Sequence, residues 1–103
     1  ILLQDYDLVI WLRLTDTLCL LGEFEDALKI LLKAKTYFKD YAEIEYRLSC
    51  LCFKFENIKK GTVHLKAALS IDFEYQFILK ELFPEVLKMK EVKDIITGFK
   101  KTS

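Results

Sequence analysis

The chain has little of the two residues that most often interrupt helices, with three glycines and one proline among 103 residues. Gly22, Gly61 and Gly98 are scattered along the chain, which excludes a glycine-rich phosphate loop. No stretch has the glycine-, proline- or serine-rich composition of a linker. We therefore expect one domain over residues 1–103, with helical periodicity throughout.

An excess of charge of one sign is also missing, because 16 basic residues balance 16 acidic ones. Nucleic-acid-binding proteins usually carry a basic stripe, so the balance argues against a nucleic-acid partner. Long apolar runs are absent too: Leu8–Leu12 is far shorter than the roughly 20 residues that span a membrane. No signal-peptide pattern opens the chain. The sequence therefore predicts neither membrane insertion nor export.

The residue clusters that carry catalysis are lacking as well. Cys19, Cys50 and Cys52 show no two-residue gap of a redox or zinc motif, and Cys50 and Cys52 would point apart on a helix. Small buried thiols in a reducing cytoplasm are the natural interpretation. His64 is the only histidine and has no triad or metal partner nearby in the sequence, so a structural or surface role is favoured. We expect no enzyme activity, no cofactor and no metal.

What the chain does contain is a match to itself when it is shifted along its own sequence. Trp11-x2-Leu14 corresponds to Glu45-x2-Leu48, and a second shift of the same length places Leu82 under Leu48. The longer pattern Phe24-x2-Ala27-x3-Leu31-x2-Ala34 corresponds to Ile58-x2-Gly61-x3-Leu65-x2-Ala68. A period of this length is typical of a stacked helical array. The small residues Ala27, Ala34, Gly61 and Ala68 are expected where paired helices approach closely.

Capping residues predict the helix ends. Helices are expected over about 8–21, 23–38, 40–55, 57–71, 72–84 and 91–100, with a kink or break at Pro84. Gly22 is the expected stop of the first, Asn57 and Asp72 are expected N-caps, and Asp40 with Glu43 resembles a capping box. Acid pairs near helix starts, Glu23 with Glu25 and Glu43 with Glu45, are interpreted as partners of the helix dipole.

The pattern Trp11-x2-Leu14, then Gly22-x-Phe24-x2-Ala27-x3-Leu31-x2-Ala34, resembles the tetratricopeptide repeat. The resemblance implies an all-α fold of helix-turn-helix repeats, stacked as a right-handed α-solenoid with about three antiparallel pairs. The repeats would be 8–41, 42–75 and a degenerate C-terminal cap, 76–103, with residues 1–7 a linker or the tail of a preceding repeat. The second repeat departs from the signature at Glu45 and Gly61.

In this family the first helix of each pair lines a concave groove. By register, the resemblance implies groove positions at Val9, Leu12, Arg13, Asp16 and Leu20, at Glu43, Tyr46, Arg47, Cys50, Phe53 and Lys54, and at Phe77, Lys80 and Glu81. Arg13 and Arg47 would lie side by side and could bind a carboxylate through two hydrogen bonds each. The alternative is that they pair with local acids such as Asp16, Glu43 or Glu81. The Lys/Asn clamp of chaperone-tail-binding members is absent, since Leu12 and Asp16 stand in its place.

The first helix is apolar nearly all round, which is typical of a helix buried on several sides. Two explanations are open: earlier repeats precede this helix, or a second copy of the chain covers it. The start at Ile1 favours the first, with the chain as a C-terminal fragment of a bacterial-type array. The leading functional hypothesis is a non-catalytic scaffold that binds a peptide or a partner helix in its groove. The alternative is a structural cap that mediates self-association and has no ligand of its own.

Overall fold

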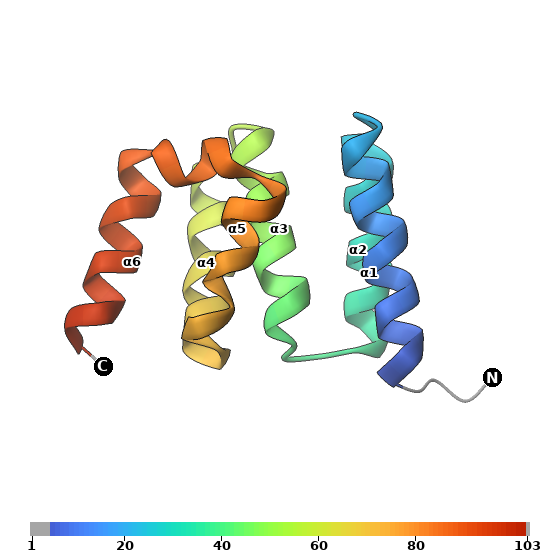
Figure 1. Cartoon of the computed structure of the whole chain (residues 1–103), viewed down its shortest axis with the longest axis horizontal. Helices are drawn as coiled ribbons and strands as arrows, with labels where there is room; N and C mark the ends of the chain where they lie inside the picture. The colour runs from blue at the N-terminus through green and yellow to red at the C-terminus, as the bar shows by residue number, and fades with distance from the viewer. Residues whose placement is uncertain (1–4, 103) are drawn as a thin grey trace.

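The computed structural model describes residues 5–102, and all regular structure in this part of the chain is helical. The elements are α1 (Asp5–Leu20), α2 (Phe24–Tyr37), α3 (Ala42–Lys54), α4 (Ile58–Ile71), the 3-10 helix η1 (Phe73–Gln76), α5 (Phe77–Leu82), the 3-10 helix η2 (Pro84–Lys88) and α6 (Lys90–Thr102). Figure 1 shows α1 and α2 at one end of the long axis, α6 at the other, and α3 to α5 between them. Residues 1–7 were expected to be a linker or the tail of a preceding repeat. Of these, residues 1–4 lie outside the described part of the chain, and residues 5–7 form the start of α1.

The turn that ends α1 recurs at the end of α3, at the spacing of the sequence repeat. In both turns the helix closes with two backbone hydrogen bonds of the Schellman type, around one residue of positive φ. That residue is Gly22 (φ 80°) in the first turn and Glu56 (φ 62°) in the second. In the first turn, Glu23 N donates to Leu18 O at 2.8 Å and Gly22 N donates to Cys19 O at 3.1 Å. In the second turn, Asn57 N donates to Cys52 O at 2.8 Å and Glu56 N donates to Phe53 O at 2.9 Å. The period of the sequence is thus also a period of the backbone.

Small residues lie where the helices of each pair pack together. Ala27 and Ala34 of α2 and Ala68 of α4 are completely buried, and Gly61 is buried as well. A Cβ atom added at Gly61 would approach the ring of Phe53 to 2.7 Å. Helix α4 can therefore pack this closely on α3 only because residue 61 has no side chain.

Helix ends agree with the predicted ones at some positions and differ at others. Asn57 is confirmed as the N-cap of α4, since its side chain accepts a hydrogen bond from Lys60 N at 3.2 Å. The capping box at Asp40 is wrong: Asp40 has φ 60°, and the residue before α3 is Tyr41, which makes no side-chain cap. Asp72 does accept from Tyr75 N (3.3 Å), but it caps the 3-10 turn η1 instead of an α-helix.

The break predicted at Pro84 is confirmed. Helix α5 ends at Leu82, and Pro84 occupies the first position of η2, where its missing N–H leaves no hydrogen bond unmade. Because α5 and η2 are both short, the chain after residue 72 makes two tight turns before α6. Residues Ile78, Leu79, Phe83 and Val86 bury their side chains, and α6 packs against α4 and η2.

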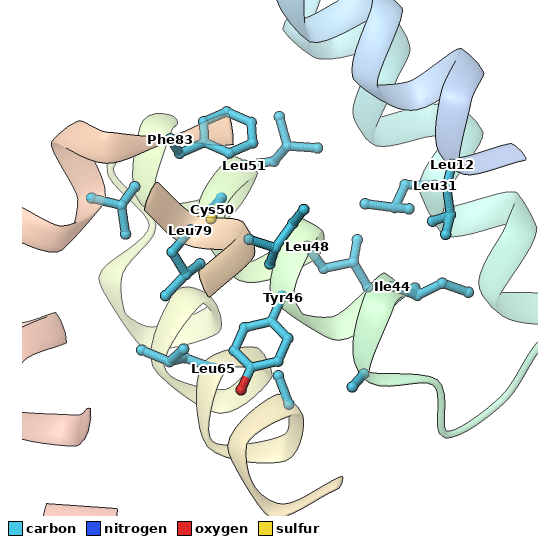
Figure 2. Packing of buried hydrophobic residues seen from close by; sticks show 14 of the residues in the cluster. Leu12, Leu31, Ile44, Tyr46, Leu48, Cys50, Leu51, Leu65, Leu79 and Phe83 are labelled. Atoms are coloured by element: carbon cyan, nitrogen blue, oxygen red, sulfur yellow. The ribbon is translucent and has the colours of Figure 1, made fainter. Parts of the chain in front are cut away.

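The core runs through the middle of the molecule around α3. Eleven residues of α3, from Ala42 to Phe53, are buried, including the polar side chains of Glu45, Arg47 and Ser49. Figure 2 shows Ile44 and Leu48 on the side of α3 that faces Leu31 and Leu12, and Cys50 close to Leu79 and Phe83. Helix α3 is therefore covered by α2 on one side and by α4, α5 and η2 on the others.

Candidate functional site

Arg47, one of the two arginines expected in a groove, is held by an acid from another helix. Its Nε lies 2.8 Å from Oδ1 of Asp16 and its Nη2 lies 2.9 Å from Oδ2, while Nη1 donates to the Glu43 carbonyl at 2.9 Å. The side chain is 5% exposed. Burial lowers the pKa of Arg47, but the hydrogen bonds and the charge of Asp16 outweigh it, so the guanidinium stays charged. Arg47 therefore pairs with a local acid, Asp16, which is the alternative to binding a ligand carboxylate.

Three neighbours of Arg47 in the expected groove are buried as well. Tyr46 is fully enclosed and its hydroxyl donates to the Asp72 carbonyl at 2.7 Å; burial raises its pKa. Cys50 and Phe53 are also in the core. These residues do not reach the surface, because η1, α5 and η2 pack on that side of α3. Burial of Tyr46, Arg47, Cys50 and Phe53 argues against a ligand-binding groove at these positions.

The remaining groove candidates are not brought together as one acceptor site. Arg13 is exposed, and none of the ion pairs among the described residues includes it. Lys54 lies over the ring of Phe24, 4.5 Å from its centroid, and 3.6 Å from a carboxylate oxygen of Glu85. The other candidates divide into Leu12, which is buried, Asp16 and Glu43, which are half-buried, and Val9, Leu20, Phe77, Lys80 and Glu81, which are exposed.

A polar cluster missed by the sequence patterns lies where α2, α3 and α4 meet. Glu45 accepts from Lys35 Nζ at 3.0 and 3.2 Å, and its Oε1 lies 3.3 Å from Nδ1 of His64. Burial raises the pKa of Glu45, but the hydrogen bonds from His64 and Lys35 outweigh it and leave the pKa below its ordinary value. Glu45 is a buried ion-pair partner and does more than complement a helix dipole.

Beside this cluster, α2 and α4 are separated by a cleft of about 320 Å³ above α3. Its walls are mostly apolar, with Lys60 and His64 on the α4 side. The lining residues are Leu28, Leu32, Leu48, Cys52, Phe55, Asn57, Lys60, Val63 and His64. The cleft exists because α2 contacts α3 but is not packed against α4 along its length.

The three cysteines are free thiols, as expected. Burial, aided by the charge of Asp16, raises the pKa of Cys19 to about 11. Burial also raises the pKa of Cys50 and of Cys52. Thiols with raised pKa values carry little thiolate at neutral pH and are poor nucleophiles.

The most distinctive surface is an apolar row on α1, which we call the outer row: Ile10, Leu14 and Leu21. Ile10 and Leu14 are one helical turn apart on the same face of α1, the exposed Thr17 occupies the next turn of that face, and Leu21 follows just past the end of the helix. They are between 45% and 70% exposed. Val9 and Leu20 are also exposed and lie to one side of the row, beyond the exposed Arg13. Exposed apolar side chains grouped in this way make the row a candidate contact surface.

Comparison with protein-family models, with curated proteins and with solved structures gives no match to this chain. Within the described residues, no three His, Cys, Asp or Glu side chains are grouped so that they could hold a metal ion. None of the helices between residues 5 and 102 has both the length and the apolar composition needed to cross a membrane. The outer row of α1 is therefore the candidate site, because its apolar side chains are exposed.

Proposed function

We propose that this chain is a non-catalytic protein-interaction module built from helix-turn-helix repeats of the tetratricopeptide kind. The recurrence of the Schellman turn after α1 and again after α3 supports the repeat, and so do the buried small residues Ala27, Gly61 and Ala68. In this proposal α1–α2 and α3–α4 are successive pairs of a right-handed array, and the elements after residue 72 form a terminal cap. Three free thiols fit a reducing compartment such as the cytoplasm.

The observation that carries the proposal is the exposed outer row of α1. Burying leucine or isoleucine side chains of this size against a partner is worth about 1.5–3 kcal/mol each, before the entropy of association is subtracted. We place the binding surface on the outer row and not in the groove first expected on α3. The reason is that Tyr46, Arg47 and Phe53 are buried and the Arg47 charge is already satisfied by Asp16.

A photo-crosslinking amino acid at position 14, in the full chain expressed in its native cells, tests the proposal. Crosslinks from position 14 to another polypeptide are expected, and Ile10→Asp should reduce them at least fivefold. The matched control is position 63 on α4, where Val63 is an apolar residue outside the row that is more exposed than Leu14, 61% against 45%. Crosslinking from position 14 that is no stronger than from position 63 would contradict the proposed function.

The same row supports a second candidate, self-association of the chain through α1 without any other ligand. An apolar face that is left open on a monomer also pairs well with a copy of itself. Sedimentation equilibrium tests it: a dimer that Ile10→Asp converts to a monomer supports self-association, whereas a monomer at every concentration excludes it.

A further inference from the structure

The internal repeat shows what a covered version of the outer row looks like. The alignment that places Trp11 on Glu45 also places Ile10 of α1 on Ile44 of α3, and Leu14 on Leu48. Ile10 and Leu14 are 60% and 45% exposed, whereas Ile44 and Leu48 are 1% and 0% exposed. The same residue types at the same repeat positions are thus exposed on α1 and buried on α3. The element that packs on Ile44 and Leu48 therefore indicates which kind of partner would fit on Ile10 and Leu14.

Helix α2 covers Ile44 and Leu48, together with Leu12 of α1 (Figure 2). Figure 2 shows Leu31 of α2 opposite Ile44 and Leu48 of α3. Leu28 and Leu32, on the same side of α2, line the cleft together with Leu48. Lys35, one turn further on, is hydrogen-bonded to Glu45. Since α2 and α3 are joined by a short turn, they run roughly antiparallel, and α2 places Leu31 and Lys35 against α3 with Leu28 and Leu32 at the edge of the cleft (Figure 2).

The other end of the molecule does not offer an equivalent open row. Helix α6 packs against α4 and buries Val92 completely, with Ile95, Ile96 and Phe99 half-buried beside it. Its outer side is polar, with the exposed residues Lys90, Glu91, Lys93, Asp94, Thr97 and Lys100. A head-to-tail stack of copies, α1 of one against α6 of the next, is therefore disfavoured, because an apolar row would face charges.

We propose that the outer row of α1 binds an amphipathic helix of the α2 type, antiparallel to α1, with leucine-like side chains three and four residues apart. This inference rests on the proposed function and adds the class of partner. It also predicts one difference from α2. The residue of α1 that corresponds to Glu45 is Trp11, which cannot accept an ion pair. The partner helix should then carry an uncharged residue where α2 has Lys35.

The probe is the α2 segment itself, a fluorescein-labelled peptide of residues 24–38. A lactam between the side chains of Glu25 and Lys29, both on the exposed side of α2, holds it helical, because an isolated helix of roughly 15 residues is marginal in water. Fluorescence anisotropy with the full chain measures its Kd. Saturable binding is expected, and a Lys35→Leu peptide should bind at least threefold more tightly. A Leu28→Glu/Leu31→Glu peptide should bind at least tenfold more weakly.

On the protein side, Ile10→Asp/Leu14→Asp should weaken peptide binding at least tenfold. Val63→Asp is the control for nonspecific apolar binding and should leave the Kd within twofold. All of these side chains are substantially exposed, so circular dichroism and the melting temperature should match wild type. Equal peptide binding by wild type and the double variant would overturn the inference, as would a dimer that the peptide cannot dissociate.

The two proposals can fail separately. If the peptide does not bind but position 14 still crosslinks another polypeptide in an Ile10-dependent way, the interaction function stands and the helix class is wrong. If position 14 also gives no specific crosslink, the proposed function fails as well.

Discussion

Asp16 and Arg47 are distant in the sequence and form a two-point ion pair between α1 and α3. The guanidinium is almost completely buried, whereas the carboxylate keeps 25% of its side-chain surface exposed. A planar guanidinium that binds both carboxylate oxygens fixes the relative position of the two helices as well as their charges. The pair therefore joins the α1–α2 hairpin to the rest of the core.

Asp16→Asn is expected to destabilise the fold. The substitution keeps the shape but leaves the buried Arg47 charge without its counter-ion, and removing one partner of a buried pair typically costs about 3–5 kcal/mol. Since Asp16 is partly exposed, we expect about 2 kcal/mol, measured as the free energy of unfolding in urea. Arg13→Ala is the matched control on the same helix, expected to change stability by less than about 0.5 kcal/mol. Equal effects of the two variants would show that the ion pair contributes nothing.

Gly61 and Gly98 should respond in opposite ways to alanine. Both are in helices, where alanine is favoured over glycine by roughly 0.5–1 kcal/mol. A Cβ at Gly98 meets nothing within 4 Å, so Gly98→Ala should raise the free energy of unfolding by about that amount. A Cβ at Gly61 meets the Phe53 ring at 2.7 Å, so Gly61→Ala should lower it by about 1–3 kcal/mol. Thermal unfolding followed by circular dichroism measures both, and a stabilising Gly61→Ala would contradict the close packing of α3 and α4.

Glu56→Gly should stabilise the protein. Glu56 has φ 62°, a left-handed conformation that costs a residue with a Cβ roughly 1–2 kcal/mol and glycine almost nothing. The gain is partly offset by the greater entropy of glycine in the unfolded chain, so the expected net increase is about 0.5–1 kcal/mol. Gly22→Ala is the reciprocal test, since Gly22 takes the same position in the first turn with nothing within 4 Å of an added Cβ. It should destabilise by about 1 kcal/mol through backbone conformation alone.

Local patterns predicted α1 to α4 and the break at Pro84, because helix ends depend on neighbouring residues, whereas the single helix expected over 72–84 is the 3-10 helix η1 followed by the short α5. Gly22, Asn57 and Pro84 act through their own backbone geometry or a hydrogen bond within one turn, and all three have the effect that the sequence predicts. Asp40 does not, although its spacing to Glu43 fits a capping box. The chain has φ 60° at that residue and starts α3 after Tyr41, so the Asp40 side chain does not cap the helix.

The candidate site was less predictable, because burial depends on elements far away in the sequence. The register that places Tyr46 and Arg47 in a groove assumes that one side of α3 stays open. In the structure η1, α5 and η2 pack there, and Asp16 from α1 satisfies the arginine. The sequence predicts a first helix that is buried on several sides, whereas Ile10 and Leu14 are exposed, because α2 is the main neighbour of α1 among the described residues.

The Glu45 cluster should make stability depend on acid pH. The folded-state pKa of Glu45 lies below its ordinary value of 4.5, since hydrogen bonds from His64 and Lys35 outweigh burial. A lowered pKa in the folded state adds stability that is fully present above about pH 4.5 and is lost as the pH falls through the folded-state value. Glu45→Gln, which keeps the shape and removes the charge, should therefore cost about 2 kcal/mol at pH 7, in the range of hydrogen bonds to charged groups.

As the pH is lowered below about 4.5 and through the folded-state pKa, the difference between wild type and Glu45→Gln should shrink, because the wild-type carboxyl takes up a proton and loses its advantage. Urea unfolding at each pH measures this difference. Glu25→Gln, on the exposed side of α2, is the control for a carboxylate with no buried partner and should change stability by less than about 0.5 kcal/mol at pH 7. A Glu45→Gln penalty that stays constant from pH 7 to pH 3 would mean that packing of the side chain, and not its charge, holds α2, α3 and α4 together.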